Sequence, residues 1–95
     1  MKFLLEYDFT EEEIENFSQN VPPLLVEKIL NSYQLISKNI ESLKNIGIQN
    51  YKNIFIKFYD MFLMDNSNFM NIFSKYDTAD LVEKIDANYE IVEFL

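Results

Sequence analysis

The sequence predicts an all-α protein, a compact bundle of about five helices that forms a single domain over residues 1–95. Three observations favour this class. Glycine occurs once and proline twice, so the chain has few turn signals and long uninterrupted segments. Apolar residues recur three and four positions apart in most of these segments. Because 48% of the residues are hydrophobic and 16% aromatic, a chain of 95 residues can fold around one core.

The first helix is predicted to begin at Thr10 and to end before the Pro22-Pro23 pair. Thr10 is a good N-cap, and Glu13, three residues later, completes a capping box. Phe9 and Ile14 occupy the two positions of a hydrophobic staple. The residue before a proline avoids helical geometry, so this helix cannot continue into the next one.

The second helix is predicted to run from Pro23 to the only glycine, Gly47, because proline is tolerated in a first helical turn. Gly47 suits the left-handed residue of a Schellman motif, in which Leu43 and Ile48 make the hydrophobic contact. The apolar stripe of this helix comprises Leu25, Ile29, Tyr33 or Ser32, Ile36, Ile40 and Leu43.

The third helix is predicted from about Asn50 to Met64, and it is the most apolar segment of the chain. Its polar side is narrow and consists of Asn53, Lys57, Asp60 and Met64. A helix this apolar either lies at the centre of its bundle or uses its extra face as an interface with itself or a partner. We favour the central position.

The fourth and fifth helices follow a break at DNSN, residues 65–68, which is rich in capping residues. The fourth is short, and the fifth is capped by Asp77 or Thr78. Their inward stripes are Phe69, Ile72, Phe73 and Tyr76 in the fourth, and Leu81, Val82, Ile85, Tyr89 and Val92 in the fifth. The N-terminus is open: Phe3, Leu5, Tyr7 and Phe9 alternate as in a short strand, but a helical turn or irregular segment is favoured because no second strand is predicted.

The charge of the chain favours a basic protein as its partner. The formal net charge is −8, and every cation is a lysine. Arginine is the usual bidentate reader of phosphate and guanine, so direct nucleic-acid binding is disfavoured. An acidic surface attracts a basic protein, although the same charge can serve solubility alone. The frequent Lys, Asn, Ile, Phe and Tyr are typical of AT-rich coding sequences, as in low-GC bacteria, their phages or some protists.

The residue types exclude most catalytic and metal-binding arrangements. Without histidine or cysteine, the chain lacks the usual general base, the thiol nucleophile and the commonest transition-metal ligands. A single glycine cannot form a phosphate-binding glycine-rich loop. We therefore expect no enzyme activity, no cofactor and no metal. The missing cysteines, the lack of a signal peptide at MKFLLEYDF and the lack of a bilayer-spanning apolar run lead us to expect a cytoplasmic protein without membrane contact.

The predicted binding residues are acidic and lie on the fifth and first helices. Glu83, Asp86, Glu90 and Glu93 fall within roughly an 80° arc of a continuous helix, with successive rises of about 4.5–6 Å. That rise is comparable to the spacing of phosphates along a nucleic-acid strand. The first helix adds Glu11, Glu12 and Glu15. Such a face can occupy a basic cleft, and the alternative is an ordinary solvated surface.

Two stretches of the sequence form a loose repeat of roughly 40 residues. FLLEYDFTEEEIENFSQNVPPLL and SLKNIGIQNYKNIFIKFYDMFLM share a leucine, a turn, a helix with inward Ile and Phe, and an apolar ending. Asp8-Phe9 stands where Gly47-Ile48 stands, and Leu25 corresponds to Leu63. The C-terminal EIVEFL resembles the start of a third unit.

This repeat resembles the helical repeats of the mitochondrial transcription termination factor (mTERF) family. Those units contain a leucine, glycine-leucine, an acidic helix start, and then proline, two residues and leucine. FTEEEIENFSQNVPPLL carries this order with Pro22 and Leu25, whereas Asp60 replaces the proline of the second unit, which contains Leu43, Gly47, Ile48 and Leu63. The resemblance implies a helical-repeat fold and, in that family, a basic groove that binds nucleic acid. This chain is acidic and has two units, so the resemblance does not carry that function over.

The function predicted from the sequence is a non-enzymatic, acidic protein-binding module. The most specific form of this hypothesis is an antagonist, inhibitor or immunity-type protein that occupies a basic site on its partner. The alternative is a structural or assembly module that forms homo-oligomers through the third helix. Nucleic-acid binding through an mTERF-like repeat is the weaker alternative.

Overall fold

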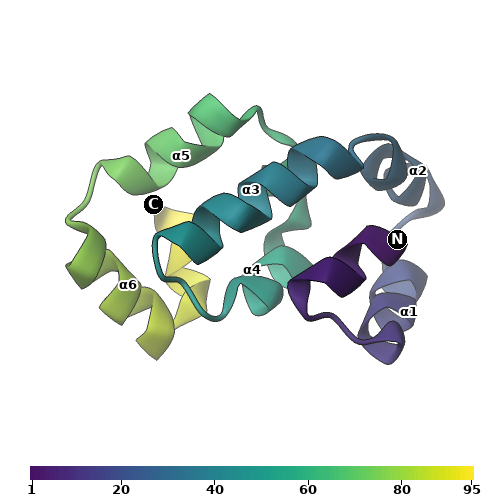
Figure 1. Ribbon diagram of the computed structural model, residues 1–95, viewed down its shortest axis with the longest axis horizontal. Coiled ribbons are helices and arrows are strands. Elements are labelled where there is room, and N and C mark those ends of the chain that lie inside the picture. Colours follow the sequence, from purple (N-terminus) through teal and green to yellow (C-terminus); the bar gives the residue numbers. More distant parts are fainter.

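Six α-helices and three short 3₁₀ helices make up the protein, and no strand is present (Figure 1). The computed structural model describes all 95 residues. In chain order the helices are η1 (Lys2–Tyr7), α1 (Glu11–Asn20), α2 (Pro23–Asn31), α3 (Tyr33–Asn45), α4 (Tyr51–Phe58), η2 (Tyr59–Leu63), α5 (Asn66–Ser74), α6 (Thr78–Ala87) and η3 (Tyr89–Phe94). The all-α prediction is confirmed, but the predicted count of about five helices is wrong.

Helix α3 crosses the middle of the bundle, and η1, α4, η2 and α5 pack against it (Figure 1). The molecule measures 36 × 24 × 22 Å along its principal axes. Helices α1 and α6 lie on opposite sides of α4 along the same edge (Figure 1). Helix α4 thus lies between α1 and α6 on this edge, and it buries Tyr51, Ile54 and Phe55 in the core.

The N-terminal segment is the 3₁₀ helix η1, so the alternative of a short strand is wrong. Leu4 and Tyr7 are its buried residues, and they stand three positions apart. A 3₁₀ helix has three residues per turn, so this spacing places both side chains on one face. The alternating pattern was misleading because Leu5, which it assigned to the same face as Tyr7, is 42% exposed.

The predicted helix over residues 23–46 is divided into α2 and α3 at Ser32. The Ser32 backbone N–H donates to the Ile29 carbonyl at 3.1 Å, which is the tighter bonding of a 3₁₀ turn. Asn31 and Ser32 both favour hydrogen bonds that compete with the helical ladder, so the helix is weakest here. On either side of the break, Ile29 on α2 and Ile36 on α3 are both fully buried in the core.

The predicted helix over residues 50–64 is likewise divided, because α4 ends at Phe58 and η2 follows. Asn39 of α3 binds the backbone at the end of η2. Its Nδ2 donates to the carbonyls of Phe62 and Met64, each at 2.9 Å, and its Oδ1 accepts from Asn66 at 2.9 Å. Asn39 is the only buried polar residue, and these bonds satisfy its amide completely.

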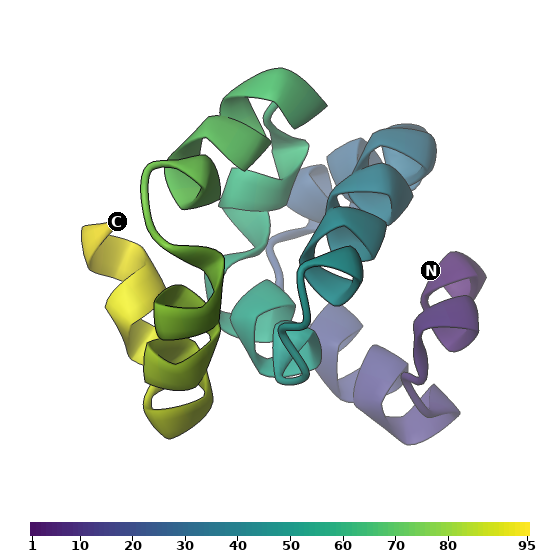
Figure 2. The ribbon, with the colours of Figure 1, turned by 60° about the vertical axis from the view of Figure 1, so that its left-hand side comes forward.

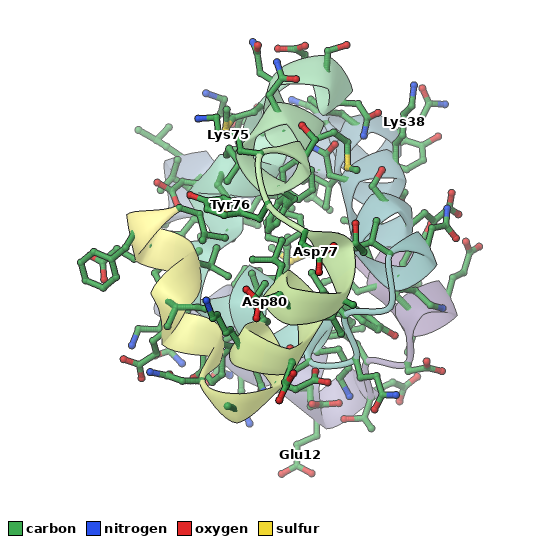
Figure 3. All side chains as sticks on the ribbon, turned by 90° about the vertical axis from the view of Figure 1, so that its left-hand side faces the viewer. Glu12, Lys38, Lys75, Tyr76, Asp77 and Asp80 are labelled. Atoms are coloured by element: carbon green, nitrogen blue, oxygen red, sulfur yellow. The ribbon has the colours of Figure 1, made fainter.

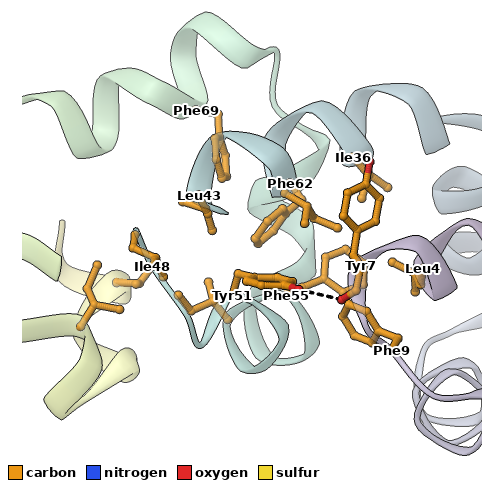
Figure 4. Packing of buried hydrophobic residues seen from close by; sticks show 14 of the residues in the cluster. Leu4, Tyr7, Phe9, Ile36, Leu43, Ile48, Tyr51, Phe55, Phe62 and Phe69 are labelled. Atoms are coloured by element: carbon orange, nitrogen blue, oxygen red, sulfur yellow. Dashed lines mark hydrogen bonds between the residues drawn. The ribbon is translucent and has the colours of Figure 1, made fainter. Parts of the chain in front are cut away.

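A connected series of aromatic rings runs through the core (Figure 4). Phe55 lies at its centre, with ring centroids 5.9 Å from Phe9, 5.1 Å from Phe17 and 5.2 Å from Phe62. The series continues from Phe62 to Phe69 at 5.1 Å. These rings join α1, α4, η2 and α5 into one core at distances where aromatic pairs attract each other.

The two corners of the sequence repeat share a left-handed residue and an equivalent backbone hydrogen bond from the residue that follows it. At the end of α3, Gly47 has φ 100°, and the Ile48 N–H donates to the Leu43 carbonyl at 3.1 Å. This bond, with the one from Gly47 N–H to the Lys44 carbonyl at 3.0 Å, confirms the predicted Schellman motif. At the end of η1, Asp8 has φ 68°, and the Phe9 N–H donates to the Leu4 carbonyl at 3.4 Å. Asp8-Phe9 and Gly47-Ile48 therefore correspond both in their place in the repeat and in their backbone hydrogen bonding.

A candidate protein-binding surface

The predicted binding residues lie in two groups, at opposite ends of one edge of the molecule (Figure 1). Glu11, Glu12 and Glu15 are on α1, and all three are exposed. Glu12 points away from the body of the protein into solvent (Figure 3). The other group comprises Glu83 and Asp86 on α6 with Glu90 and Glu93 on η3, and these four are also exposed.

The second group does not form the continuous row that the sequence predicted. Helix α6 ends at Ala87, and Asn88 is extended with φ −156° and ψ 99°. The Asn88 side chain then accepts the Glu90 backbone N–H at 3.1 Å and so starts η3. Since η3 folds back beside α6 (Figure 2), Glu90 and Glu93 are not on the same helical face as Glu83 and Asp86. The predicted fifth helix through Val92 is therefore wrong.

Only one of the seven predicted residues forms an ion pair. Glu90 lies 3.1 Å from the Nζ of Lys57 on α4, and both side chains are about half exposed. The two other ion pairs are Lys52 with Glu13 and Lys84 with Asp80. The remaining six predicted carboxylates therefore face solvent without a lysine partner.

Glu13, which sequence reasoning assigned only to the capping box, also joins the two repeat units. Its Oε1 accepts the Thr10 backbone N–H at 2.9 Å, which confirms the capping box, and the Lys52 Nζ at 2.9 Å. Lys52 is held in addition by the Asp8 carbonyl at 2.8 Å. The Thr10 N–H, followed by Lys52, lowers the pKa of Glu13, so this carboxylate stays ionised at neutral pH. No sequence signal identifies its pairing with a lysine 39 positions away.

A polar hollow of about 530 Å³ lies between α1, the start of α4, and α6. Glu13, Lys52 and Asp86 contribute its charged groups, and Gln49, Asn50 and Asn53 contribute amides. Asn50 Nδ2 donates to the Ile85 carbonyl at 3.0 Å, whereas its buried Oδ1 has no hydrogen-bond donor. The structure therefore brings the predicted residue Asp86 close to Glu13 across the N-terminal end of α4.

An apolar groove of about 250 Å³ lies on the other side of Glu13, between α1 and α4. Phe17, Val21, Ile56 and Tyr59 supply its apolar lining, and Glu13, Asn16 and Asn20 its polar rim. Phe17 and Val21 are each only 5% exposed, whereas Ile56 is 38% exposed. The sequence did not predict this groove, because the groove depends on how α1 packs against α4.

The apolar surplus of the third predicted helix is largely used inside the protein. Tyr51, Ile54, Phe55 and Phe62 are buried, and the partly exposed Phe58, Tyr59, Met61 and Leu63 pack against the core. Ile56, at 38%, is the one large apolar residue of α4 and η2 that is exposed. Any interface on this helix therefore centres on the groove beside Ile56.

Comparisons with protein-family models, with curated proteins and with solved structures each found no match to this chain. No set of three or more acidic side chains lies close enough together to hold a metal ion. None of the helices combines the length and the apolar character needed to cross a bilayer. The proposals below therefore rest on the charge, exposure and packing of the residues described above.

Proposed function

We propose that this protein is a non-enzymatic binding module whose acidic surface occupies a basic site on another protein, as an antagonist, inhibitor or immunity-type protein. One observation carries the proposal. Of the 16 acidic side chains, all except Glu13 are exposed, yet the chain has only three ion pairs. Most of the negative charge is therefore available to a partner.

This charge distribution has a physical consequence for binding. A net charge of −8 on a molecule whose longest dimension is 36 Å attracts a basic protein and accelerates their encounter. The same charge repels phosphate groups, which makes protein a better partner than nucleic acid. Binding should weaken as salt rises, because exposed charges are screened over about 8–10 Å at 0.10–0.15 M.

The partner is proposed to meet the edge that carries α1, the start of α4, and α6. Glu11, Glu12 and Glu15 lie at one end of this edge, and Glu83 and Asp86 lie at the other. Glu93 on η3 extends the acidic surface, while Glu90 is partly neutralised by Lys57. The proposed surface thus keeps all seven residues, but in two groups rather than one row.

The alternative function is an assembly module that associates with copies of itself. The exposure of Ile56 beside the apolar groove favours it, since an apolar side chain gains free energy when a second molecule covers it. Sedimentation at micromolar concentration tests this alternative. An oligomer that becomes monomeric on Ile56→Lys would support assembly, and a monomer would contradict it.

The antagonist proposal is tested by reversing the charge of the three unpaired acids on α6 and η3. The triple variant Glu83→Lys, Asp86→Lys, Glu93→Lys should lose a captured basic partner, and wild-type binding should weaken steeply between 50 and 200 mM salt. The matched control reverses Glu6, Glu27 and Asp60, which are exposed, form no ion pair and lie outside the proposed surface. Equal binding by both triple variants, or binding indifferent to salt, would refute the proposal.

A further inference from the structure

We infer that the apolar groove and the polar hollow form one docking site, and that its ligand is a segment of a basic protein with an apolar side chain next to a lysine or arginine. The inference rests on the proposed function, because it names the chemistry of the partner that the acidic surface attracts. It goes further by assigning the recognition to Glu13, Ile56 and Asp86, of which only Asp86 belongs to the seven acids named above.

The two hollows adjoin because Glu13 lines both of them. On the α4 side, Asn53 lines the polar hollow and Ile56 lines the apolar groove. These residues are three positions apart, which is about one helical turn or roughly 5 Å of rise. A ligand side chain in the groove therefore lies within one side-chain length of the polar hollow.

The apolar part of the site is preformed. Phe17 lies at the bottom of the groove, and its ring contacts Phe55 at 5.1 Å and Tyr59 at 5.5 Å between centroids. Phe17 therefore has little freedom to lose when a ligand binds. Ile56, 38% exposed, forms the open wall and would be covered by an apolar anchor of the ligand.

The polar part offers acceptors for a cation. Both hydrogen bonds to Glu13 end on Oε1, so Oε2 has no protein partner, and the exposed carboxylate of Asp86 has none either. Lys52 does not fill this role, since the Asp8 carbonyl and Glu13 hold it in place. Asn50 also lines this hollow, but its Oδ1 is buried, so the acceptors open to a ligand are the carboxylates of Glu13 and Asp86. A lysine or arginine side chain supplies the missing donors.

Charge complementarity selects this occupant over the others. A nucleic acid would place phosphates against Glu13 and Asp86, which is repulsive. A second copy of the chain would bring together two molecules that each carry a net charge of −8. A basic segment neutralises the carboxylates while its apolar residue covers Ile56.

The test is a selection from a displayed library of random 12-residue peptides against the whole wild-type protein. We expect enriched peptides in which an aromatic or aliphatic residue lies within about four positions of a lysine or arginine. Their affinity should fall about tenfold or more on Ile56→Lys and on Asp86→Lys. Glu27→Lys, which makes the same charge change as Asp86→Lys at an exposed position on α2, should leave their affinity unchanged.

A second variant guards against misfolding of Ile56→Lys. Asn16→Trp adds no charge, and it fills the groove from its exposed rim, so it should also abolish peptide binding while the circular dichroism spectrum stays helical. Failure to enrich any peptide, enrichment of acidic peptides, or peptide binding that survives both groove variants would overturn the inference. A dimer that dissociates on Ile56→Lys would also overturn it, because a second copy would then be the occupant.

Failure of this inference is distinguishable from failure of the proposed function. Suppose that the enriched basic peptides bind Ile56→Lys and Asn16→Trp as well as they bind the wild type, but do not bind the triple variant of Glu83, Asp86 and Glu93. The docking site would then be wrong while the acidic-surface function stands. If neither salt nor the triple reversal weakened binding of the partner, the proposed function itself would be wrong.

Discussion

The two corners of the repeat share a left-handed residue but are stabilised in different ways. At the second corner the left-handed residue is Gly47, which adopts φ 100° without steric cost. At the first corner it is Asp8, whose Cβ makes φ 68° unfavourable. One corner therefore depends on the backbone freedom of glycine, and the other requires compensation from its surroundings.

The compensation at the first corner comes from the second repeat unit. The Tyr51 hydroxyl lies 2.9 Å from the Tyr7 carbonyl and 3.0 Å from Asp8 Oδ2, two acceptors that share its single proton. Lys52 donates to the Asp8 carbonyl at 2.8 Å. Tyr51 and Lys52, at the start of α4, thus stabilise the corner before α1 through hydrogen bonds. The less favourable corner is therefore also the one that links the two units, and this link places Glu13 beside the start of α4.

The largest expected effect comes from removing the ring that both units share. Phe55 is fully buried and contacts Phe9 and Phe17 of the first unit and Phe62 of the second. Phe55→Ala should lower the free energy of unfolding by about 3–5 kcal/mol, measured by denaturant titration. Phe94→Ala, at a ring that is 82% exposed, should change it by less than about 0.5 kcal/mol. Similar losses in the two variants would mean that the units do not share this core.

The next effect distinguishes the two corners directly. Gly47→Ala should cost about 1–2 kcal/mol because an alanine is strained at φ 100°, and not because of crowding, since the added Cβ would lie 3.9 Å from Val82. Asp8→Gly should be nearly neutral in thermal and chemical unfolding, because relief of backbone strain offsets the lost bond from Tyr51. If Asp8→Gly were as harmful as Gly47→Ala, the two corners would not be stabilised differently.

The third prediction concerns the hydroxyl that fastens the first corner. Tyr51→Phe should destabilise the protein by about 1–1.5 kcal/mol at neutral pH, since Tyr7 and Asp8 lose a donor. Burial, followed by the contact with Asp8, raises the pKa of Tyr51 from 10.0 to about 12. The folded state then holds a proton that the unfolded state releases. This contribution is complete below pH 10 and is lost as the pH rises toward 12.

The pH dependence provides the control for this prediction. In denaturant titrations from pH 8 upward, the gap between wild type and Tyr51→Phe should be constant to pH 10 and then narrow. Tyr33→Phe removes a hydroxyl from a ring that is 47% exposed, and it should not reproduce this pattern. A gap that stays constant above pH 10 would show that the Tyr51 hydroxyl is not engaged in the folded state.

The local signals in the sequence predicted the ends of helices well, and the tertiary contacts decided the rest. Caps at Thr10 and Asp77 and the turn at Gly47 depend on residues within a few positions, and the structure confirms all three. The end of η2 is instead bound by Asn39, which donates to the carbonyls of Phe62 and Met64, 23 and 25 positions away. Periodicity cannot show such a contact, and it predicted one long apolar helix where α4 and η2 form.

The candidate site divides in the same way. The composition predicted the acidic surface, because the net charge of −8 and the use of lysine as the only cation can be read from the sequence without a structure. The meeting of Glu13 with Lys52 and Asp86 needs the packing of three helices, so Glu13 was assigned only its local role as a cap. The break at Asn88 moved Glu90 and Glu93 off the face of α6 for a similar reason, since the return of η3 against α6 is a tertiary contact.

The smallest predicted effect contrasts the helix starts that follow the two corners. Thr10 accepts the Glu13 N–H at 3.1 Å, whereas Asn50, the equivalent residue before α4, makes no capping bond and instead donates to Ile85. Thr10→Ala should therefore cost about 1 kcal/mol, and Thr10→Ser almost nothing, in denaturant titrations. Thr10→Ala should also free the Glu13 carboxylate from its bond with the Thr10 N–H, which is held only while the capping box is closed, and leave its contact with Lys52 of α4. An unchanged stability would mean that Lys52 alone positions Glu13, and that the first unit depends on the second for its helix start as well as for its corner.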